Sequence, residues 1–266
     1  MQQFRRLTVD DLDLCTALAV DRDWPPEEEK WRLLLTVGEG YGLDGPDGGL
    51  AAAFVLARYG TELAAVSMVL VAERFGRQGI GERMMRYALD ECGDATAFLC
   101  ATPIGRPVYE RVGFEVDGMV TSYRGRYRSA GTRVGLRPLT DVEDIDREVF
   151  GADRSGLLKL LPDFAERAYA TADGTGYAAS WRNGQTLMVG PVVAGDLDTA
   201  ASLIDAVVGE DTGGPVRLDT ADPAMEELVR ARGLETYFEV VTMTYGGRQL
   251  PGDRTRIRAL FMQALG

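Results

Sequence analysis

The residues of this chain best suited to chemistry are six in a row, Gly76 to Gly81 (GRQGIG). They follow an apolar run, Ala64 to Val71, and precede a helical pattern that continues to Cys92. Glycine lets the main chain approach a ligand closely, and the first N–H groups of a helix have no partner within the helix. Because the helix dipole adds partial positive charge at that end, the sequence predicts a site for a phosphate or pyrophosphate.

The helix itself is predicted from the spacing of its apolar residues. They recur every three or four positions, at Ile80, Met84, Met85, Ala88, Leu89 and Cys92. Charged residues fall on the opposite side, so one face packs and the other meets water.

Two families of phosphate-binding loop fit these glycines poorly. A P-loop ends in Gly-Lys-Ser/Thr, whereas Glu82 follows Gly81 here, and the chain has only two lysines. A dinucleotide-binding loop has a third glycine where this chain has Met84, and an acidic residue at the end of the next strand. The strand expected at Thr96 to Ala101 ends without an acid.

A third family fits the order and spacing of two segments. The run from Val71 to Gly81 (VAERFGRQGIG) and the segment from Arg106 to Phe114 (RPVYERVGF) resemble the GNAT superfamily of acyl-CoA N-acyltransferases. The first is similar to the superfamily's pyrophosphate loop, Arg/Gln-x-x-Gly-x-Gly/Ala, and the second to its Tyr-Glu-x-x-Gly-Phe segment. The chain departs at one point, because Gly76 takes the usual Arg/Gln place and Arg77 follows it. The main-chain N–H groups of the loop do not depend on that side-chain order. The resemblance covers roughly residues 1 to 130.

The resemblance implies direct acyl transfer from acetyl-CoA to an amine, with acetyl-CoA as co-substrate and no metal. It implies that the main chain of Val69, Leu70 and Val71 pairs with the pantetheine arm, as an added strand would. The phenol of Tyr109 would give its proton to the departing thiolate. The pyrophosphate would be held by the amides of Arg77, Gln78, Gly79, Ile80, Gly81 and Glu82.

The base and the acceptor site stay open at this stage. A proton must leave the amine, and the chain has no histidine, so a carboxylate or a water chain is expected to take it. The carboxylates nearest the motifs are Glu62, Glu73, Glu110 and Asp117. The acceptor is expected between the first two helices, where Asp21, Asp23, Trp24, Glu27 and Glu28 gather; Asp23, Trp24 and Glu27 are the candidates for binding it, and a plain wet surface is the alternative.

The length of 266 residues suits two domains, and the pattern of elements restarts after about residue 130. We predict a mixed α/β fold of two tandem GNAT-like domains, 1–130 and 131–266, each a mostly antiparallel central sheet flanked by helices. Leu228 to Leu234 stands where the first copy has Tyr109 to Phe114. The second copy has no Gly-x-Gly pair, and its loop from Gly190 to Asp198 carries two aspartates that would repel a pyrophosphate. We therefore expect a degenerate, structural or substrate-shaping domain.

Several boundaries follow from turn and period signals. A hairpin is expected from Leu50 to Tyr59 and from Leu63 to Val71. The last strand of the first domain is expected from Val120 to Arg128, and a helix interrupted at Pro162 from Gly156 to Tyr169.

Composition narrows the partners and the compartment. The net charge of −12 repels a nucleic-acid backbone, and there is no apolar run of 18 residues and no basic-apolar leader, so neither nucleic acid nor membrane is expected. The three cysteines, Cys15, Cys92 and Cys100, lack metal-ligand spacing and are expected in the core of a cytoplasmic protein. The oligomeric state, including a homodimer, stays open.

Together these features favour an N-acetyltransferase that modifies a primary amine of a small molecule. Two alternatives remain from the sequence: a non-catalytic acyl-CoA-binding sensor module, and a protein or peptide N-acetyltransferase.

Overall fold

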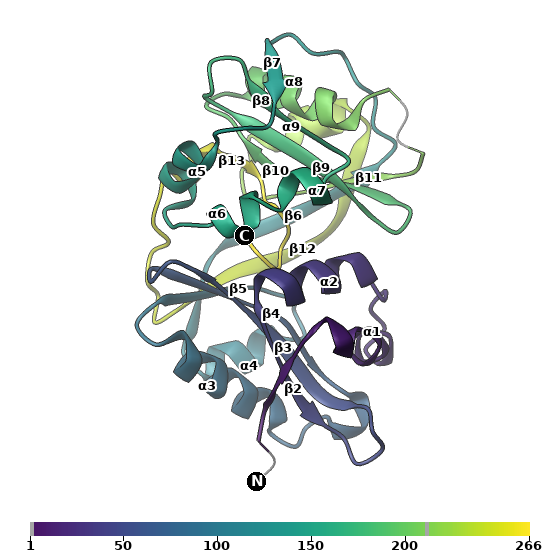
Figure 1. Cartoon of the computed structure of the whole chain (residues 1–266), viewed down its shortest axis with the longest axis vertical. Coiled ribbons are helices and arrows are strands. Elements are labelled where there is room, and N and C mark those ends of the chain that lie inside the picture. Colours follow the sequence, from purple (N-terminus) through teal and green to yellow (C-terminus); the bar gives the residue numbers. More distant parts are fainter. Residues whose placement is uncertain (1–2, 211–212) are drawn as a thin grey trace. The chain divides into compact units, whose positions relative to one another are not determined.

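The computed structural model describes residues 3–210 and 213–266 (Figure 1). These residues form two compact units, and each unit is built from two segments of the chain. The first unit combines Met1–Asp117 with Met243–Arg248, and the second combines Gly118–Thr242 with Gln249–Gly266.

The first unit is a sheet with helices on both faces. Its strands follow the order β1-β2-β3-β4-β5, with the last residues of β12 beside β5; neighbours are antiparallel from β1 to β4, whereas β4 and β5 are parallel. Its elements are β1 (Arg5–Leu7), α1 (Leu12–Asp21), α2 (Glu28–Val37), β2 (Glu39–Asp44), β3 (Leu50–Tyr59), β4 (Leu63–Val71), α3 (Ile80–Cys92), β5 (Thr96–Ala101), α4 (Arg106–Arg111) and the start of β6 (Phe114–Gly125), with 3-10 turns at Val9–Asp11 and Glu73–Phe75.

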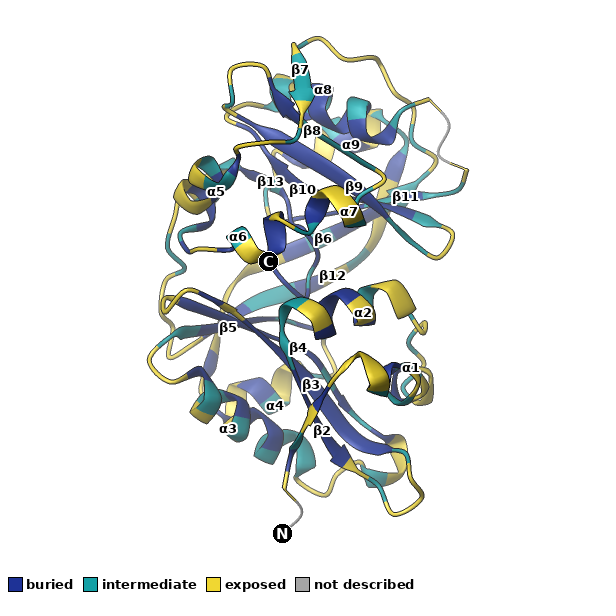
Figure 2. Cartoon of the chain, viewed as in Figure 1, coloured by how far each residue is buried: buried dark blue, intermediate teal, exposed yellow. Residues whose placement is uncertain are grey.

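Neighbouring residues of β3 show which helices cover which face. The ring of Phe54 lies 6.3 Å from the ring of Tyr87 on α3. Val55 points to the opposite face, where a Cβ added to Gly38, at the end of α2, would meet Val55 Cγ1 at 2.9 Å. Since α1 packs on α2 and α4 packs on α3, the two pairs of helices cover opposite faces (Figure 1). Strands β3 and β4 between them are buried along most of their length (Figure 2).

Two irregularities shape β4. Its pairing with β3 shifts register between Ala53/Leu70 and Val55/Ser67, which places one extra residue in β4, and Met68 takes a φ of 51° there. Its parallel pairing with β5 runs only from Leu63/Thr96 to Ala65/Phe98. Beyond Ala65, therefore, the edge of β4 that faces β5 carries backbone groups without a partner strand in the described chain.

The second unit repeats this plan. Its strands follow the order β12-β6-β11-β10-β9-β8-β7, β13 pairs with β10, and β10 and β11 form its parallel pair. Its elements are the rest of β6, β7 (Leu136–Pro138), α5 (Glu143–Phe150), α6 (Ser155–Leu158), α7 (Leu161–Phe164), β8 (Arg167–Thr171), β9 (Tyr177–Asn183), β10 (Thr186–Val193), α8 (Leu197–Val208), β11 (Val216–Thr220), α9 (Met225–Ala231), β12 (Leu234–Tyr245) and β13 (Ile257–Ala259), with a 3-10 turn at Arg254–Arg256. The predicted class, two mostly antiparallel sheets flanked by helices, is confirmed.

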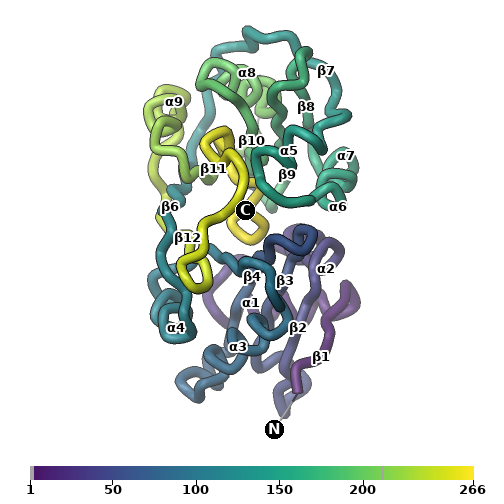
Figure 3. Tube along the Cα trace, turned by 90° about the vertical axis from the view of Figure 1, so that its left-hand side faces the viewer, coloured from purple at the N-terminus to yellow at the C-terminus, as the bar shows by residue number. Residues whose placement is uncertain are grey.

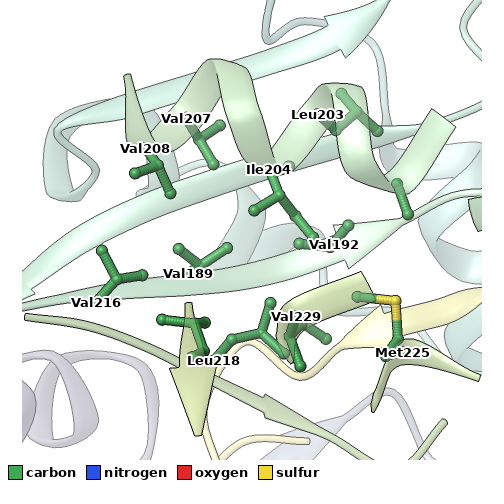
Figure 4. Close-up of a cluster of buried hydrophobic side chains, with 14 of the residues drawn as sticks. Val189, Val192, Leu203, Ile204, Val207, Val208, Val216, Leu218, Met225 and Val229 are labelled. Atoms are coloured by element: carbon green, nitrogen blue, oxygen red, sulfur yellow. The ribbon is translucent and has the colours of Figure 1, made fainter. Parts of the chain in front are cut away.

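The core of the second unit lies between α8, α9 and the sheet (Figure 4). Leu203, Ile204 and Val207 of α8 face Val189 and Val192 of β10 and are fully buried. Their three- and four-residue spacing is the pattern that predicted this helix.

Two predicted elements differ from the structure. The helix expected from Gly156 to Tyr169 is wrong: α6 and α7 are single turns, and Arg167–Thr171 is the strand β8. Pro162 sits in the first turn of α7, and pairing of β8 with β9 overrides the helical spacing of the residues that follow. The strand expected from Val120 begins earlier, at Phe114, directly after Gly113 with its φ of 102°.

A buried ion pair anchors the start of the second unit's helical layer. The side chains of Arg154 and Asp146 are each 1% exposed, and their Nη2 and Oδ1 atoms lie 2.8 Å apart. The hydroxyl of Tyr177 also donates to Asp146, and Arg154 donates to the carbonyl of Gly266 at 3.2 Å. If one member of such a pair is removed, the other charge remains buried without the opposite charge of the pair, which is destabilising.

We expect Asp146→Ala to lower the free energy of unfolding by about 3–5 kcal/mol, because the buried Arg154 would lose the carboxylate that lies 2.8 Å from it. Urea unfolding measures this change. The matched control is Glu226→Ala, which breaks an exposed pair with Arg230 and is expected to cost less than about 1 kcal/mol. Equal losses in the free energy of unfolding for the two variants would contradict the view that the buried pair of Asp146 and Arg154 is the more important of the two.

Candidate active site

A pocket of about 480 Å³ lies where β4 and β5 separate in the first unit. Strand β4 forms its floor with Val66–Val71, and β5 adds Cys100. Both helical faces contribute to it, because Arg22 and Trp24 come from the connection between α1 and α2, and Tyr109 comes from α4. The other lining residues are Phe75, Gly76, Arg77, Gly79, Ile80, Gly81, Glu82, Thr102, Ile104, Gly105, Val108 and Arg111.

The start of α3 opens onto this pocket without a cap of its own. Gly79 is the N-cap residue, with a φ of 74°, and no side chain of the described chain caps the helix from this position. The N–H groups of the first turn have no intrahelical acceptor, since that of Arg83 is the first to bond back, to the carbonyl of Gly79 at 3.0 Å. A Cβ at Gly79 would meet nothing within 4 Å, so the space beside this N-cap residue is open.

The loop before α3 bends sharply to reach this position. Arg77 has a φ of 59°, a left-handed conformation that costs a non-glycine residue about 1 kcal/mol or more. Such strain concentrates at ligand-binding loops.

The structure brings together most of the residues expected to hold the co-substrate. All of Val69, Leu70, Val71, Arg77, Gly79, Ile80, Gly81 and Glu82 line the one pocket. Gln78 does not line it, and its side-chain amide instead donates to the carbonyl of Arg74 at 3.4 Å.

The charge of the lining favours an anion. Arg22, Arg77 and Arg111 are its cationic residues. Glu82 is the acidic one among the lining residues, and its carboxylate is engaged by Arg86 of the same helix at 2.8 Å. Cations together with uncapped amides suit a phosphate-bearing ligand.

Tyr109 is held in the wall of the pocket. Its ring centroid lies 6.3 Å from that of Phe114, and a Cβ at Gly105 would approach its hydroxyl to 3.0 Å. Burial raises the pKa of Tyr109 to about 12. The phenol is therefore a proton donor throughout the neutral range.

Ser67 is a pocket residue that the sequence reasoning missed. It is 8% exposed, and its hydroxyl has no hydrogen-bond partner within the described residues. Because Ser67 stands directly opposite Val55 in the β3–β4 ladder, both side chains lie on the face covered by α2. The sequence feature that could have identified Ser67 is that it is the one polar residue in the apolar run Ala64–Val71.

The acceptor was expected near five residues, and of these the pocket lining includes Trp24 but none of the four carboxylates, Asp21, Asp23, Glu27 and Glu28. Glu27 pairs with Lys30 at 2.8 Å and Glu28 with Arg32 at 3.1 Å. A carboxylate oxygen of Asp21 accepts a hydrogen bond from the amide of Glu73 at 2.7 Å. Asp23 is exposed, with a φ of 57°, and is not among the lining residues.

The candidate bases named from the sequence lie away from the pocket lining. Glu62, Glu73 and Asp117 are exposed, and Glu110 pairs with Arg106 at 2.6 Å on the outer side of α4.

The expectation that all three cysteines are buried is wrong for Cys100, which is half-buried because the β5 edge opens at the pocket.

The equivalent region of the second unit is filled by the chain itself. Strand β13 pairs with the end of β10 at Val192 and Val193, and the amide of Leu260 donates to the carbonyl of Asp219 on β11 at 2.9 Å (Figure 3). Asp196 caps α8 by accepting from the amide of Thr199 at 2.8 Å. In the second unit, therefore, protein groups occupy the gap between the parallel strands β10 and β11, and a protein side chain caps the start of α8.

Within 3–210 and 213–266, no group of three or more His, Cys, Asp or Glu side chains is arranged to hold a metal ion. No helix in that part of the chain has the length and apolar character needed to cross a bilayer.

Comparison with known proteins agrees with this geometry. Residues 50–126 and residues 142–259 each match a model described as an acetyltransferase (GNAT) domain. The chain is 29% identical over 259 residues to the uncharacterized N-acetyltransferase YitH of Bacillus subtilis (strain 168), with 91% of each chain covered.

Solved structures are similar along the whole chain. A proposed acetyltransferase from Pyrococcus horikoshii has a TM-score of 0.86 at 19% identity, covering 100% of this chain and 96% of its own. A tandem GNAT protein from the clavulanic acid biosynthesis pathway has a TM-score of 0.64 at 19% identity, covering 94% of this chain and 100% of its own.

The two matching domain models and the similar curated N-acetyltransferase support acyltransferase activity. More particularly, the chain belongs to the GNAT acetyltransferase family and carries two domains of that family in tandem.

We expect Ser67→Ala to raise the free energy of unfolding of the ligand-free protein by about 1 kcal/mol, because a buried hydroxyl without a partner is costly. Urea unfolding measures it. The control is Ser180→Ala, since Ser180 is also buried but donates to the carbonyl of Val207 at 2.7 Å; that variant is expected to lose about 1–3 kcal/mol. A loss of the same size in Ser67→Ala would show that this hydroxyl has a partner.

Proposed function

We propose that the first unit is an N-acetyltransferase that moves an acetyl group from acetyl-CoA to a primary amine of a small molecule. The observation that carries this proposal is the meeting, in one pocket, of the uncapped start of α3, the unpaired edge of β4 and the phenol of Tyr109. Each meets one need of the reaction: an anion site, a backbone edge for an extended arm, and a proton donor.

The chain's own groups would hold the co-substrate in the following way. The amides between Arg77 and Glu82 bind the pyrophosphate, and the edge of Val69–Val71 pairs with the pantetheine arm. At the bulge near Met68, backbone N–H groups turn out of the ladder and polarise the thioester carbonyl.

Tyr109 acts as the general acid. As the amine nitrogen attacks the carbonyl carbon, the C–N bond forms and the C–S bond breaks, and the phenol gives its proton to the departing sulfur. Water takes the proton that the ammonium group loses, because the one carboxylate in the lining, that of Glu82, is paired with Arg86. Exchange with solvent then reprotonates Tyr109.

Two other functions compete with this one. A non-catalytic acyl-CoA sensor would share the anion site, but it has no use for a protonated phenol in the wall of the pocket. A protein or peptide N-acetyltransferase would share all three features and differ in the acceptor. We favour the small molecule, acting in the cytoplasm where thiols such as Cys100 stay reduced.

We also propose that residues 131–266 form a degenerate domain without acyl-CoA. Its support is the filling of the β10–β11 gap by Leu260 and the capping of α8 by Asp196.

Thiol release from acetyl-CoA with a panel of small amines and peptides tests the proposed activity. We expect turnover with small amines and little with peptides. Calorimetry that finds binding without turnover on any acceptor would favour the sensor, and efficient turnover of peptides alone would favour the protein acetyltransferase.

A matched pair at Gly79 tests the anion site. Aspartate and asparagine both tolerate a left-handed backbone, and both are able to cap a helix, as Asp196 does for α8. Only aspartate adds a negative charge, so we expect Gly79→Asp to weaken CoA binding at least about tenfold more than Gly79→Asn. Calorimetry measures both affinities, with one site expected per chain. Equal affinities, or a second site that survives in Gly79→Asp, would count against the assignment.

Tyr109→Phe tests the general acid. We expect kcat to fall by about 100-fold or more, with the affinity for CoA unchanged, since the phenyl ring keeps its packing. The raised pKa of about 12 keeps the phenol protonated below that value, so wild-type kcat should show no basic limb from this group up to about pH 10. Steady-state rates and calorimetry check both points, and unchanged turnover in the variant would remove Tyr109 from the mechanism.

A further inference from the structure

The connection between α1 and α2 presents a cation to the pocket. Arg22 directly follows α1, where its amide donates to the carbonyl of Ala19 at 3.0 Å, so its backbone position is fixed. Its side chain lines the pocket and makes no hydrogen bond or ion pair with any residue within 3–210 or 213–266. An arginine that is half-buried and has no hydrogen-bond or ion-pair partner in the described residues suits an anionic ligand group.

None of the neighbouring carboxylates, Asp21, Asp23 and Glu27, forms an ion pair with Arg22 within residues 3–210 and 213–266. Asp21 accepts from the amide of Glu73 at 2.7 Å, and Glu27 is held by Lys30 at 2.8 Å. Of this connection, Arg22 and Trp24 are the residues that line the pocket. This is the reverse of the negative surface that its composition suggests.

Arg22 and the expected pyrophosphate site are attached to helices on opposite faces of the sheet, and the two regions meet where Asp21 accepts from the amide of Glu73 at 2.7 Å. The start of α3 and Tyr109 belong to the helices on one face of the sheet, whereas Arg22 and Trp24 connect the helices on the other face. The unpaired hydroxyl of Ser67 also lies on that second face. If the co-substrate enters along α3, the acceptor meets the thioester from the side of Arg22, Trp24 and Ser67.

We propose that the acceptor is an amino-carboxylate, a small molecule with an amine and a carboxylate. Arg22 binds its carboxylate, Trp24 covers its body, and Ser67 accepts a hydrogen bond from its amine. A planar guanidinium offers paired N–H donors that match a carboxylate. This inference rests on the proposed function and names its acceptor class.

Paired acceptors test this assignment in the full-length protein. Thiol release is measured with a panel of free amino acids and with the primary amides of the same amino acids, for wild type and Arg22→Gln. We expect the ratio of kcat/KM, acid over amide, to fall by about 10- to 100-fold in the variant, the range of a charge-assisted hydrogen bond. Comparing the ratio between the two proteins cancels the different amine pKa values of acid and amide.

Three controls separate the outcomes. Arg32→Gln removes an exposed arginine of α2 that pairs with Glu28, and it should leave the ratio unchanged. Calorimetry should find the affinity for CoA equal in wild type and Arg22→Gln; a weakened affinity would assign Arg22 to the co-substrate and overturn the inference. Arg22→Lys should keep part of the preference for the free acid.

The results also distinguish this inference from the proposed function. Wild-type turnover that is indifferent to the carboxylate, or a ratio that does not move in Arg22→Gln, overturns the acceptor class alone. Absence of thiol release with every amine overturns the acetyltransferase itself.

Discussion

The separation of two parallel strands organises this molecule. After Ala65 and Phe98, β4 and β5 no longer pair, and the backbone groups exposed there must find partners elsewhere. The bulge at Met68 turns β4 at the same point, so the opening coincides with a change in the direction of the backbone. Everything assigned to the active site, from the start of α3 to Tyr109 and Ser67, surrounds this one interruption.

The two units satisfy the same constraint differently. In the second unit β10 and β11 part after Val189 and Leu218, and β10 has its own irregularity before Val192. There the chain supplies β13 and Leu260 as permanent partners, and Gly190 leaves room for the carbonyl of Leu260, which a Cβ would approach to 1.9 Å. A protein strand in one unit thus stands where the other unit keeps an opening, and this difference is the physical basis for proposing that the second unit binds no acyl-CoA.

Much of this was predictable from local sequence. The glycine loop, the hairpin ending at Val71, α3 and β5 follow from period and turn chemistry, and they carry most of the residues expected at the co-substrate site. Features that depend on contacts between distant parts of the chain were not predictable from local sequence. The strand Arg167–Thr171 was read as helix because its pairing with β9 lies outside its own sequence, and β13 is too short to give a periodic signal. Likewise, the acidic group after α1 was expected to hold the acceptor, but Glu27 and Glu28 are engaged in ion pairs, and it is Arg22 that lines the pocket beside Trp24.

The first unit closes with residues taken from far along the chain. Tyr245 places its ring 5.6 Å from that of Phe114, the amide of Gly246 donates to the carbonyl of Gly113, and Arg248 reaches the carbonyl of Asp94. The first two contacts brace the turn that follows α4, the helix of Tyr109, and the third braces the turn that follows α3. A gene fragment that stopped at the apparent midpoint would encode the first unit without Met243–Arg248, so the pocket-bearing unit depends on a segment that the chain reaches only after the second unit is nearly complete.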